Sequence, residues 1–267
     1  MNRLNLAFEG AKRDGRKMLC PFLTAGYPSL DATAQLLLAA QQAGADMVEV
    51  GIPFSDPVAD GPVIQASYTH ALARGSTVAK CLATIAEARK LGVTIPLAAM
   101  VSFSIIFKRG TKEFAKACAD HGVDGLILPD IPLEEAPAIV DAMREAGLRS
   151  TLLVAPTSPA ARRAAIARLC DGFIYYLSVS GITGERKALP ADIAPNIAEL
   201  RKVTEVPICV GFGISTAEQV REVTRVADGA IVGSALIRRL ATVLERPIGE
   251  QCSAAGSFIK ELAAGLR

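Results

Sequence analysis

The residues of this chain best placed for chemistry are two carboxylic acids within residues 46–62. Glu49 lies in the largely apolar run 46–50, which predicts a strand, and Asp60 lies in the proline-containing loop that follows. Side chains alternate along a strand, so Glu49 faces away from Val48 and Val50. A buried, charged acid without a partner costs several kcal/mol. We therefore expect either a structural ion pair with an arginine or acid–base chemistry on a bound ligand, and the second acid favours the latter.

These acids must be positioned by a repeated unit of short apolar run, loop and helical pattern. Strands are predicted at 18–23, 47–50, 96–101, 125–128, 151–154, 172–176, 207–210 and 229–232. Helices are predicted at 30–43, 62–74, 78–91, 112–121, 133–146, 158–169, 194–203, 216–223, 234–240 and 250–264, and residues 1–9 read as an amphipathic helix start. Serines stand at expected N-cap positions and glycines follow helix ends (Ser29, Ser158, Ser215; Gly44, Gly122, Gly147).

Eight strands alternating with helices, without a linker or composition break, predict an α/β fold of the (β/α)8 TIM-barrel class. We expect a single domain over residues 1–267, with an added N-terminal helix and extra helices. A doubly wound sheet is the alternative, and the count of eight strands disfavours it. In such a barrel the chemistry lies at the C-terminal ends of the strands.

Glycine-rich loops follow the last three predicted strands. They are Ser178–Gly184, Gly211–Ser215 and the Gly233-Ser234 pair. The last two open helices, where backbone N–H groups and the helix dipole favour an anion. One Gly-x-Gly usually marks only a tight turn, but three such loops in a barrel predict a phosphate site. The substrate should therefore be a small phosphate ester whose reacting part extends towards Glu49.

The composition excludes several other classes of protein. The 29 basic and 27 acidic residues are interspersed and give a net charge of +2, so no basic stripe suggests nucleic acid. Six scattered cysteines without a C-x-x-C pair are typical of a reduced, cytoplasmic protein. His70 and His121 lack ligand-spaced neighbours, so we expect no metal site. No apolar run reaches membrane-spanning length, and the N-terminus does not resemble a signal peptide.

Several segments together resemble the tryptophan synthase alpha subunit family. The most specific is the run Glu49–Pro62, which reads Glu-x-Gly-x-Pro-Phe-Ser-Asp-Pro-x-Ala-Asp-Gly-Pro and is followed by Ile64-Gln65. The others are Pro21–Pro28, Leu128–Glu135, Tyr175–Gly184, Gly211–Ser215 and Gly233-Ser234. They occur in order over nearly the whole chain, and the Glu49–Pro62 run is too long to be a chance match.

The resemblance implies a carbon–carbon lyase of tryptophan biosynthesis that cleaves indole-3-glycerol phosphate reversibly into indole and glyceraldehyde 3-phosphate. It assigns Glu49 as the general acid and base, because a desolvated glutamate can have a pKa near neutrality. Asp60 corresponds to the carboxylate that accepts the indole N–H, and Tyr175 to a tyrosine beside the acid. Plainer alternatives remain: Asp60 could cap the helix that starts at 61–62, and Tyr175 could be a packed core residue.

The resemblance also implies the substrate-binding residues. The phosphate would rest on backbone amides at four positions (Gly184, Gly213, Gly233 and Ser234), and Thr183 would belong to a lid that closes over the site. Apolar walls for the indole ring would come from four side chains (Phe22, Met100, Ile127 and Phe212). A role in the core serves equally well for Phe22 and Met100.

The family works with a beta subunit that binds pyridoxal phosphate, in an alpha2-beta2 tetramer. This chain has no lysine motif for that cofactor, so we expect it to bind none. The loop around Asp56 and the region 108–112 would contact the partner, while Glu134 and Glu135 serve equally well as the first turn of a helix. The chain departs from the family at Ser102-Phe103-Ser104, where Tyr-x-Asn is usual.

Three alternatives to an alpha subunit acting in a complex stay open at this point. The first is a stand-alone indole-3-glycerol phosphate lyase. The second is a catalytically weak module that activates the beta subunit, and the altered segment 102–104 is its only support. The third is another phosphate-binding barrel, such as a sugar-phosphate epimerase, against which the lack of metal-ligating histidines counts.

Overall fold

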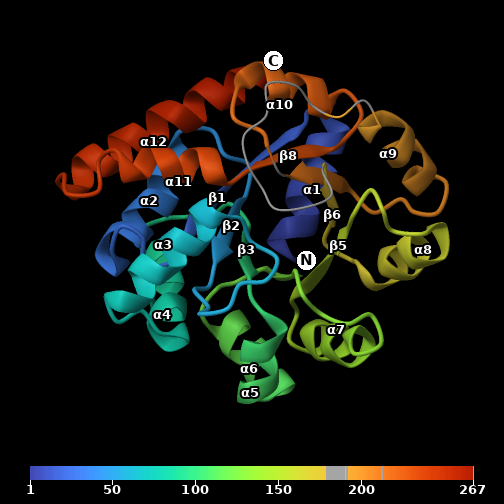
Figure 1. Ribbon diagram of the computed structural model, residues 1–267, viewed down its shortest axis with the longest axis horizontal. Helices are drawn as coiled ribbons and strands as arrows, with labels where there is room; N and C mark the ends of the chain where they lie inside the picture. The colour runs from blue at the N-terminus through green and yellow to red at the C-terminus, as the bar shows by residue number, and fades with distance from the viewer. Residues whose placement is uncertain (179–189, 191, 212, 267) are drawn as a thin grey trace.

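The computed structural model describes residues 1–178, 190, 192–211 and 213–266. Eight parallel strands pair in chain order, and β1 closes the barrel against β8 (Figure 1). The strands are β1 (Met18–Thr24), β2 (Val48–Gly51), β3 (Leu97–Met100), β4 (Gly125–Leu128), β5 (Arg149–Val154), β6 (Ile174–Leu177), β7 (Ile208–Gly211) and β8 (Gly229–Val232). The predicted (β/α)8 barrel is confirmed, and the doubly wound alternative is wrong because the sheet is closed.

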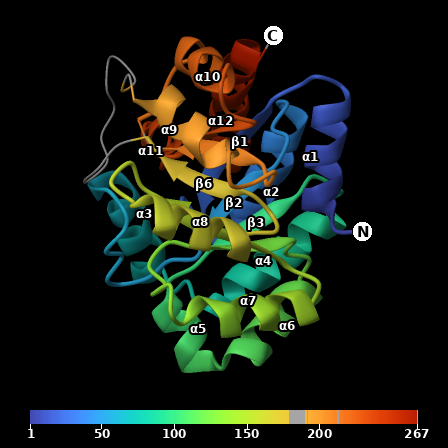
Figure 2. The same ribbon diagram turned by 90° about the vertical axis from the view of Figure 1, so that its right-hand side faces the viewer.

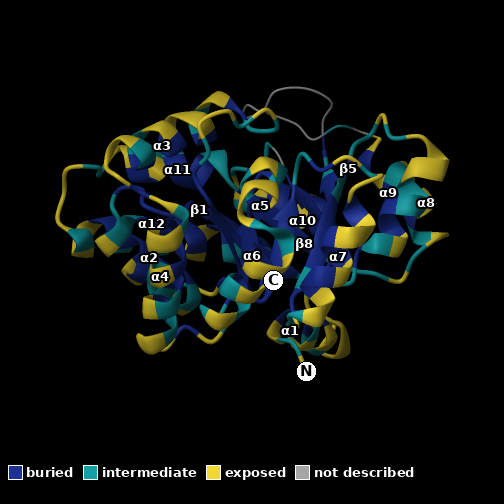
Figure 3. Ribbon diagram, turned by 90° about the horizontal axis from the view of Figure 1, so that it is seen from below, coloured by how far each residue is buried: buried dark blue, intermediate teal, exposed yellow. Residues whose placement is uncertain are grey.

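Helices surround the barrel and present their polar faces outward, while the strands are buried (Figure 3). They are α1 (Arg3–Arg13), α2 (Leu30–Gln42), α3 (Pro62–Ala73), α4 (Val78–Lys90), α5 (Phe103–Arg109), α6 (Thr111–Asp120), α7 (Ala136–Glu145), α8 (Ala160–Leu169), α9 (Ile193–Arg201), α10 (Ala217–Thr224), α11 (Ser234–Ala241) and α12 (Ile248–Ala263). The predicted N-terminal helix α1 lies across the end where the strands begin. There Asn2 donates hydrogen bonds to the carbonyls of Asp124 and Gly147.

The sequence patterns missed helix α5. It follows β3 directly and contacts α6 (Figure 2), and Gly110, with φ of 85°, separates the two helices. Seven residues are too short for a helical period to stand out from the predicted strand before them. The segment 102–104 therefore forms the start of α5.

Three local predictions were wrong. The N-caps of α8 and α10 are Pro159 and Thr216, each one residue beyond the predicted serines, Ser158 and Ser215. Ser158 instead accepts a hydrogen bond from the Ala155 N–H within the preceding turn. Helix α7 begins only at Ala136, so Glu134 and Glu135 lie in the turn before it. By contrast, Ser29 caps α2 as predicted.

An aspartate precedes every even-numbered strand and joins it to the strand before it. Each carboxylate accepts a hydrogen bond from the backbone at the start of the preceding odd-numbered strand (Asp46 from Leu19, Asp124 from Leu97, Asp171 from Ser150, Asp228 from Ile208), at 2.7–2.8 Å. Each also pairs with arginine (Arg16; Arg3 and Arg89; Arg144 and Arg149; Arg201). The barrel floor is thus four repeats of one carboxylate clamp, at the end opposite the predicted chemistry.

Candidate active site

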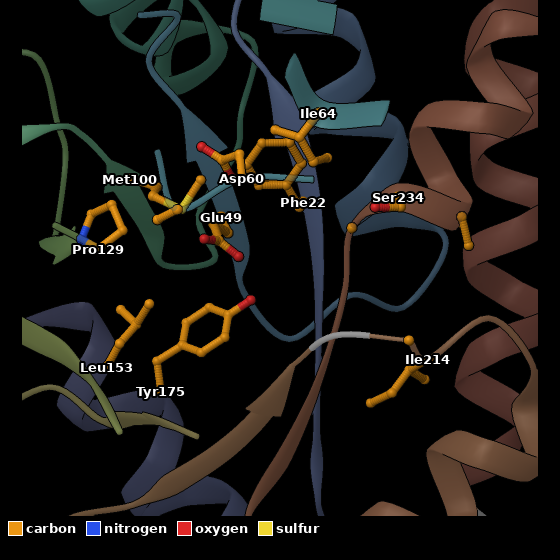
Figure 4. A pocket seen from close by; sticks show the side chains of 14 residues that line it. Phe22, Glu49, Asp60, Ile64, Met100, Pro129, Leu153, Tyr175, Ile214 and Ser234 are labelled. Carbon is orange, nitrogen blue, oxygen red and sulfur yellow. The ribbon is translucent and has the colours of Figure 1, made fainter. Parts of the chain in front are cut away.

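A pocket opens at the C-terminal ends of the strands and gathers most of the predicted site residues. Its empty volume, which includes the open space at its mouth, is about 650 Å³. Figure 4 shows Glu49, Asp60 and Tyr175 directed into one space, with Ser234 on the opposite side. The lining residues are Phe22, Glu49, Ala59, Asp60, Ile64, Met100, Pro129, Leu153, Tyr175, Gly213, Ile214, Gly233, Ser234 and Ala235.

Glu49 lies in β2 and points into the barrel, as the strand alternation predicts. Its side chain is 0% exposed, and neither carboxylate oxygen has a hydrogen-bond partner among the described residues. Burial, with a smaller contribution from the charge of Asp60, raises the pKa of Glu49 to about 8. Around neutral pH this carboxyl therefore carries a proton and sits close to its titration point. A buried acid in this state can both give and take a proton.

Asp60 lies in the loop between β2 and α3. Burial and then the charge of Asp130 raise the pKa of Asp60 to about 7. The N-cap of α3 is Gly61, followed by Pro62, and no side-chain hydrogen bond caps this helix. The alternative that Asp60 is a helix cap is therefore wrong. Its carboxylate is left to act in the pocket, while its backbone carbonyl accepts a hydrogen bond from Gln65 at 2.8 Å.

Tyr175 projects from β6 towards Glu49 (Figure 4). Burial and the neighbouring charge of Glu49 raise the pKa of Tyr175 well above its ordinary value, so the phenol stays neutral. A glycine makes room for the ring: a Cβ at Gly211 would lie 2.4 Å from the Tyr175 hydroxyl. Gly51 does the same for Phe22, whose Cζ would be 2.5 Å from a Cβ there. Because neither glycine has a side chain, both aromatic rings have room to occupy these positions beside the pocket.

The far side of the pocket consists of backbone near the starts of two helices. Gly213, with φ of 80°, follows β7, and Ser234 is the first residue of α11, directly after β8. The first-turn N–H groups of a helix have no acceptors within it. Gly213, Gly233 and Ser234, all predicted to bind phosphate, thus come together at one anion-compatible wall. Thr183, Gly184 and Phe212 lie outside the described residues.

The apolar walls differ in part from the prediction. Phe22 and Met100 line the pocket, but Ile127 is fully buried and is not one of the lining residues. Ile127 pairs with Met100 in the barrel register and also faces the barrel interior, but it is fully buried there. The sequence patterns did not predict Leu153, a β5 residue that pairs with Tyr175 in register and lines the pocket. The other lining residues that they did not predict come from loops and helix starts (Ala59, Ile64, Pro129, Ile214 and Ala235).

Ser102 has a defined partner in the folded chain. Its hydroxyl donates to one Asp130 oxygen at 2.6 Å, and the Phe103 N–H donates to the other at 2.8 Å. Ser102, which the family resemblance marks as a departure, thus holds an acid next to the site. The sequence alone could not link Ser102 to Asp130, because this hydrogen bond joins the loop after β3 to the loop after β4.

Two absences concern the part of the chain that the structure describes. There, no group of three or more histidine, cysteine, aspartate and glutamate side chains is arranged to hold a metal ion. None of the described helices is both long and apolar enough to cross a bilayer.

The fold and the pocket define a (β/α)8-barrel protein with an acid–base site at the C-terminal face of the barrel. A model of the family described as tryptophan synthase alpha chain matches residues 8–263. The tryptophan synthase alpha chain of Rhodopirellula baltica is 43% identical over 272 residues, 98% of each chain. That of a Synechococcus species is 45% identical over 258 residues, covering 96% of this chain and 94% of the relative.

A solved structure agrees with these sequence relatives. Tryptophan synthase subunit alpha from Legionella pneumophila is similar with a TM-score of 0.88 at 33% identity, covering 100% of this chain and 98% of that one. The chain belongs to the tryptophan synthase alpha chain family. It is a lyase of tryptophan biosynthesis, as the sequence motifs predicted.

Proposed function

We propose that this chain cleaves indole-3-glycerol phosphate reversibly to indole and glyceraldehyde 3-phosphate by a retro-aldol reaction. The observation that carries the proposal is Glu49: a fully buried carboxyl in the pocket, with both oxygens unpartnered among the described residues and a pKa of about 8. Burying a carboxyl without a partner lowers the stability of the fold, and carboxyl groups with a strongly shifted pKa cluster at sites of chemistry.

Glu49 moves the proton in two steps. In its neutral form it protonates the indole C3, which makes that carbon a leaving group. The resulting carboxylate then takes the proton from the side-chain hydroxyl next to C3. As the carbonyl of glyceraldehyde 3-phosphate forms, the electron pair of the breaking C–C bond returns to the ring and gives indole. Glu49 ends in its starting protonation state, as a catalyst must.

Asp60 stabilises the charge that appears in the first step. Protonation at C3 places positive charge on the indole nitrogen, and a carboxylate that accepts the N–H bond offsets it. The positive charge itself favours the ionised form of Asp60, whose pKa in the free protein is about 7. Tyr175 would orient Glu49 and the substrate from the other side of the pocket.

The phosphate of the substrate would bind at the wall formed by Gly213, Gly233 and Ser234, with Gly184 as a further amide. Phe22 and Met100 would contact the indole ring, and Thr183 and Phe212 keep their proposed roles in the lid and the ring wall. Figure 4 supports the arrangement, because Ser234 lies across the pocket from Glu49. A ligand held at both ends presents its reacting bond to the acid.

For partners, we propose a tryptophan synthase beta subunit in an alpha2-beta2 tetramer. Two large apolar side chains in the segments that follow β2 and β3 are exposed, Val58 by 83% and Phe107 by 74%. They belong to the loop after β2, which also carries the exposed Asp56, and to α5. Pyridoxal phosphate would be held by the partner, and we expect no cofactor in this chain.

The test is spectroscopic detection of indole from indole-3-glycerol phosphate, with and without a beta subunit. Glu49→Gln should lower indole formation by about 10²-fold or more, since a general acid–base contributes roughly 10²–10⁴. Glu9→Gln, at an exposed acid on α1, is the matched control and should leave the rate unchanged. Unchanged indole formation by Glu49→Gln in the complex would favour a weak activating module. Strong activity without the beta subunit would favour a stand-alone lyase.

A further inference from the structure

A second, smaller cavity lies beside the pocket and brings Asp130 close to Asp60. It has an empty volume of about 270 Å³, and its lining includes both aspartates together with Ser102. It shares Ala59, Asp60, Met100 and Pro129 with the main pocket. The two cavities therefore meet at Asp60, which faces Glu49 on one side and Asp130 on the other.

Asp130 is held in place from α5. Both its carboxylate oxygens accept short hydrogen bonds, one from the Ser102 hydroxyl and one from the Phe103 N–H. Two donors to one carboxylate fix its orientation. A negative charge is thus anchored beside Asp60 by the first residues of a surface helix.

Among the described residues, the titratable groups that interact with Asp60 are two carboxyl groups and two phenols. Glu49 comes from β2, Tyr68 from α3, Tyr175 from β6 and Asp130 from the loop after β4. After burial, Asp130 is the cause that most raises the pKa of Asp60. A more basic carboxylate binds a cation or a polarised N–H group more strongly.

We propose that Asp130 is a positioning residue for Asp60: α5 holds it, and its charge makes Asp60 a stronger acceptor for the positive charge that develops on the substrate nitrogen. Its catalytic meaning rests on the proposed function. Because Ser102 and Phe103 begin α5, a contact that displaces this helix also displaces the charge beside Asp60.

The test is titration of the Asp60 carboxyl by NMR in the substrate-free chain labelled with [4-13C]aspartate, the signal being assigned by its loss in Asp60→Asn. Asp130→Asn should lower the Asp60 midpoint by about one pH unit. Asp130→Glu retains the charge and should keep the midpoint near that of the parent chain. Glu134→Gln removes an exposed negative charge four residues away and should have no effect.

Ser102→Ala tests the link to α5 and serves if Asp130→Asn does not fold. It loosens the Asp130 carboxylate, so the midpoint should fall by a smaller amount, whereas Ser104→Ala at the exposed neighbour should not move it. An unchanged midpoint in a folded Asp130→Asn chain, or in Ser102→Ala, overturns the inference. This titration needs no turnover, so it fails independently of the proposed reaction. If that reaction holds, the acidic limb of its pH profile should move down with the Asp60 midpoint.

Discussion

Glu49→Gln should stabilise the folded chain at alkaline pH, although it removes the proposed catalyst. The pKa of Glu49 rises from its ordinary 4.5 to about 8 in the folded chain, chiefly through burial. The folded state therefore binds this proton more tightly than the unfolded state, and stability falls as pH rises. The loss begins near pH 4.5, grows up to about pH 8 and is complete above it. Glutamine has no such proton, and its variant escapes the loss.

The magnitude follows from the difference between the two pKa values. A gap of about 3.5, at about 1.4 kcal/mol per pH unit, gives a ceiling of about 5 kcal/mol. Glu49 is coupled to Asp60, which also titrates near neutrality, so the net gain should be smaller, about 3 kcal/mol at pH 9. At pH 4 both side chains are neutral, and the two proteins should differ by no more than about 1 kcal/mol.

The assay is urea denaturation of both proteins at several pH values, followed by far-UV circular dichroism. Glu9→Gln provides the control for the loss of an exposed carboxylate, and its stability should run parallel to that of the parent chain. If the difference between Glu49→Gln and the parent is the same at pH 5 and pH 9, the carboxyl is not held neutral by the fold. The acid–base assignment would then lose its physical basis.

Three further outcomes are expected. Gly211→Ala should lower indole formation by about 10-fold or more and cost roughly 1–3 kcal/mol of stability, because its Cβ would lie 2.4 Å from the Tyr175 hydroxyl. Steady-state kinetics measure the rate and urea denaturation measures the stability. An unaltered rate would show that the position of the Tyr175 ring is unimportant. Asp124→Ala should lower the free energy of unfolding by about 3–5 kcal/mol, since it leaves Arg89 without its 2.6 Å partner at the barrel floor. A loss below about 1 kcal/mol in urea denaturation would show that this clamp does not stabilise the barrel. Phe107→Ser should weaken beta-subunit binding about 10-fold in calorimetry while the melting temperature stays constant, and equal affinity would place the interface elsewhere.

Much of the barrel could be predicted from local pattern alone. The bounds of β4 and β8 agree with the prediction to the residue, because glycine opens each run and apolar residues fill it. Glu49 was placed correctly because one inward polar residue in an apolar strand is a strong signal. Its neutral state could not be derived from sequence, since it depends on how many groups bury it.

What the patterns missed depends on contacts between separate segments. Leu153 and Ile127 both face the barrel interior, yet only Leu153 lines the pocket, because strand stagger sets which inward residue is uppermost. The bond between Ser102 and Asp130 joins two loops 28 residues apart. The resemblance to the family marked Ser102 as a departure, but only the fold shows that it holds Asp130.

The carboxylate clamps at the barrel floor join the eight strands in four consecutive pairs. The backbone and arginine partners of Asp46 and Asp124 lie in the half of the chain that holds the first four strands, and those of Asp171 and Asp228 lie in the other half. Between the halves, Asp228 adds an ion pair with Lys17 at 3.9 Å. A chain opened in the turn after β4 would therefore leave every clamp intact on its own side. The scaffold is held together far from the pocket, so the opposite end of the barrel can carry the cost of burying Glu49, whose carboxyl is without a hydrogen-bond partner among the described residues.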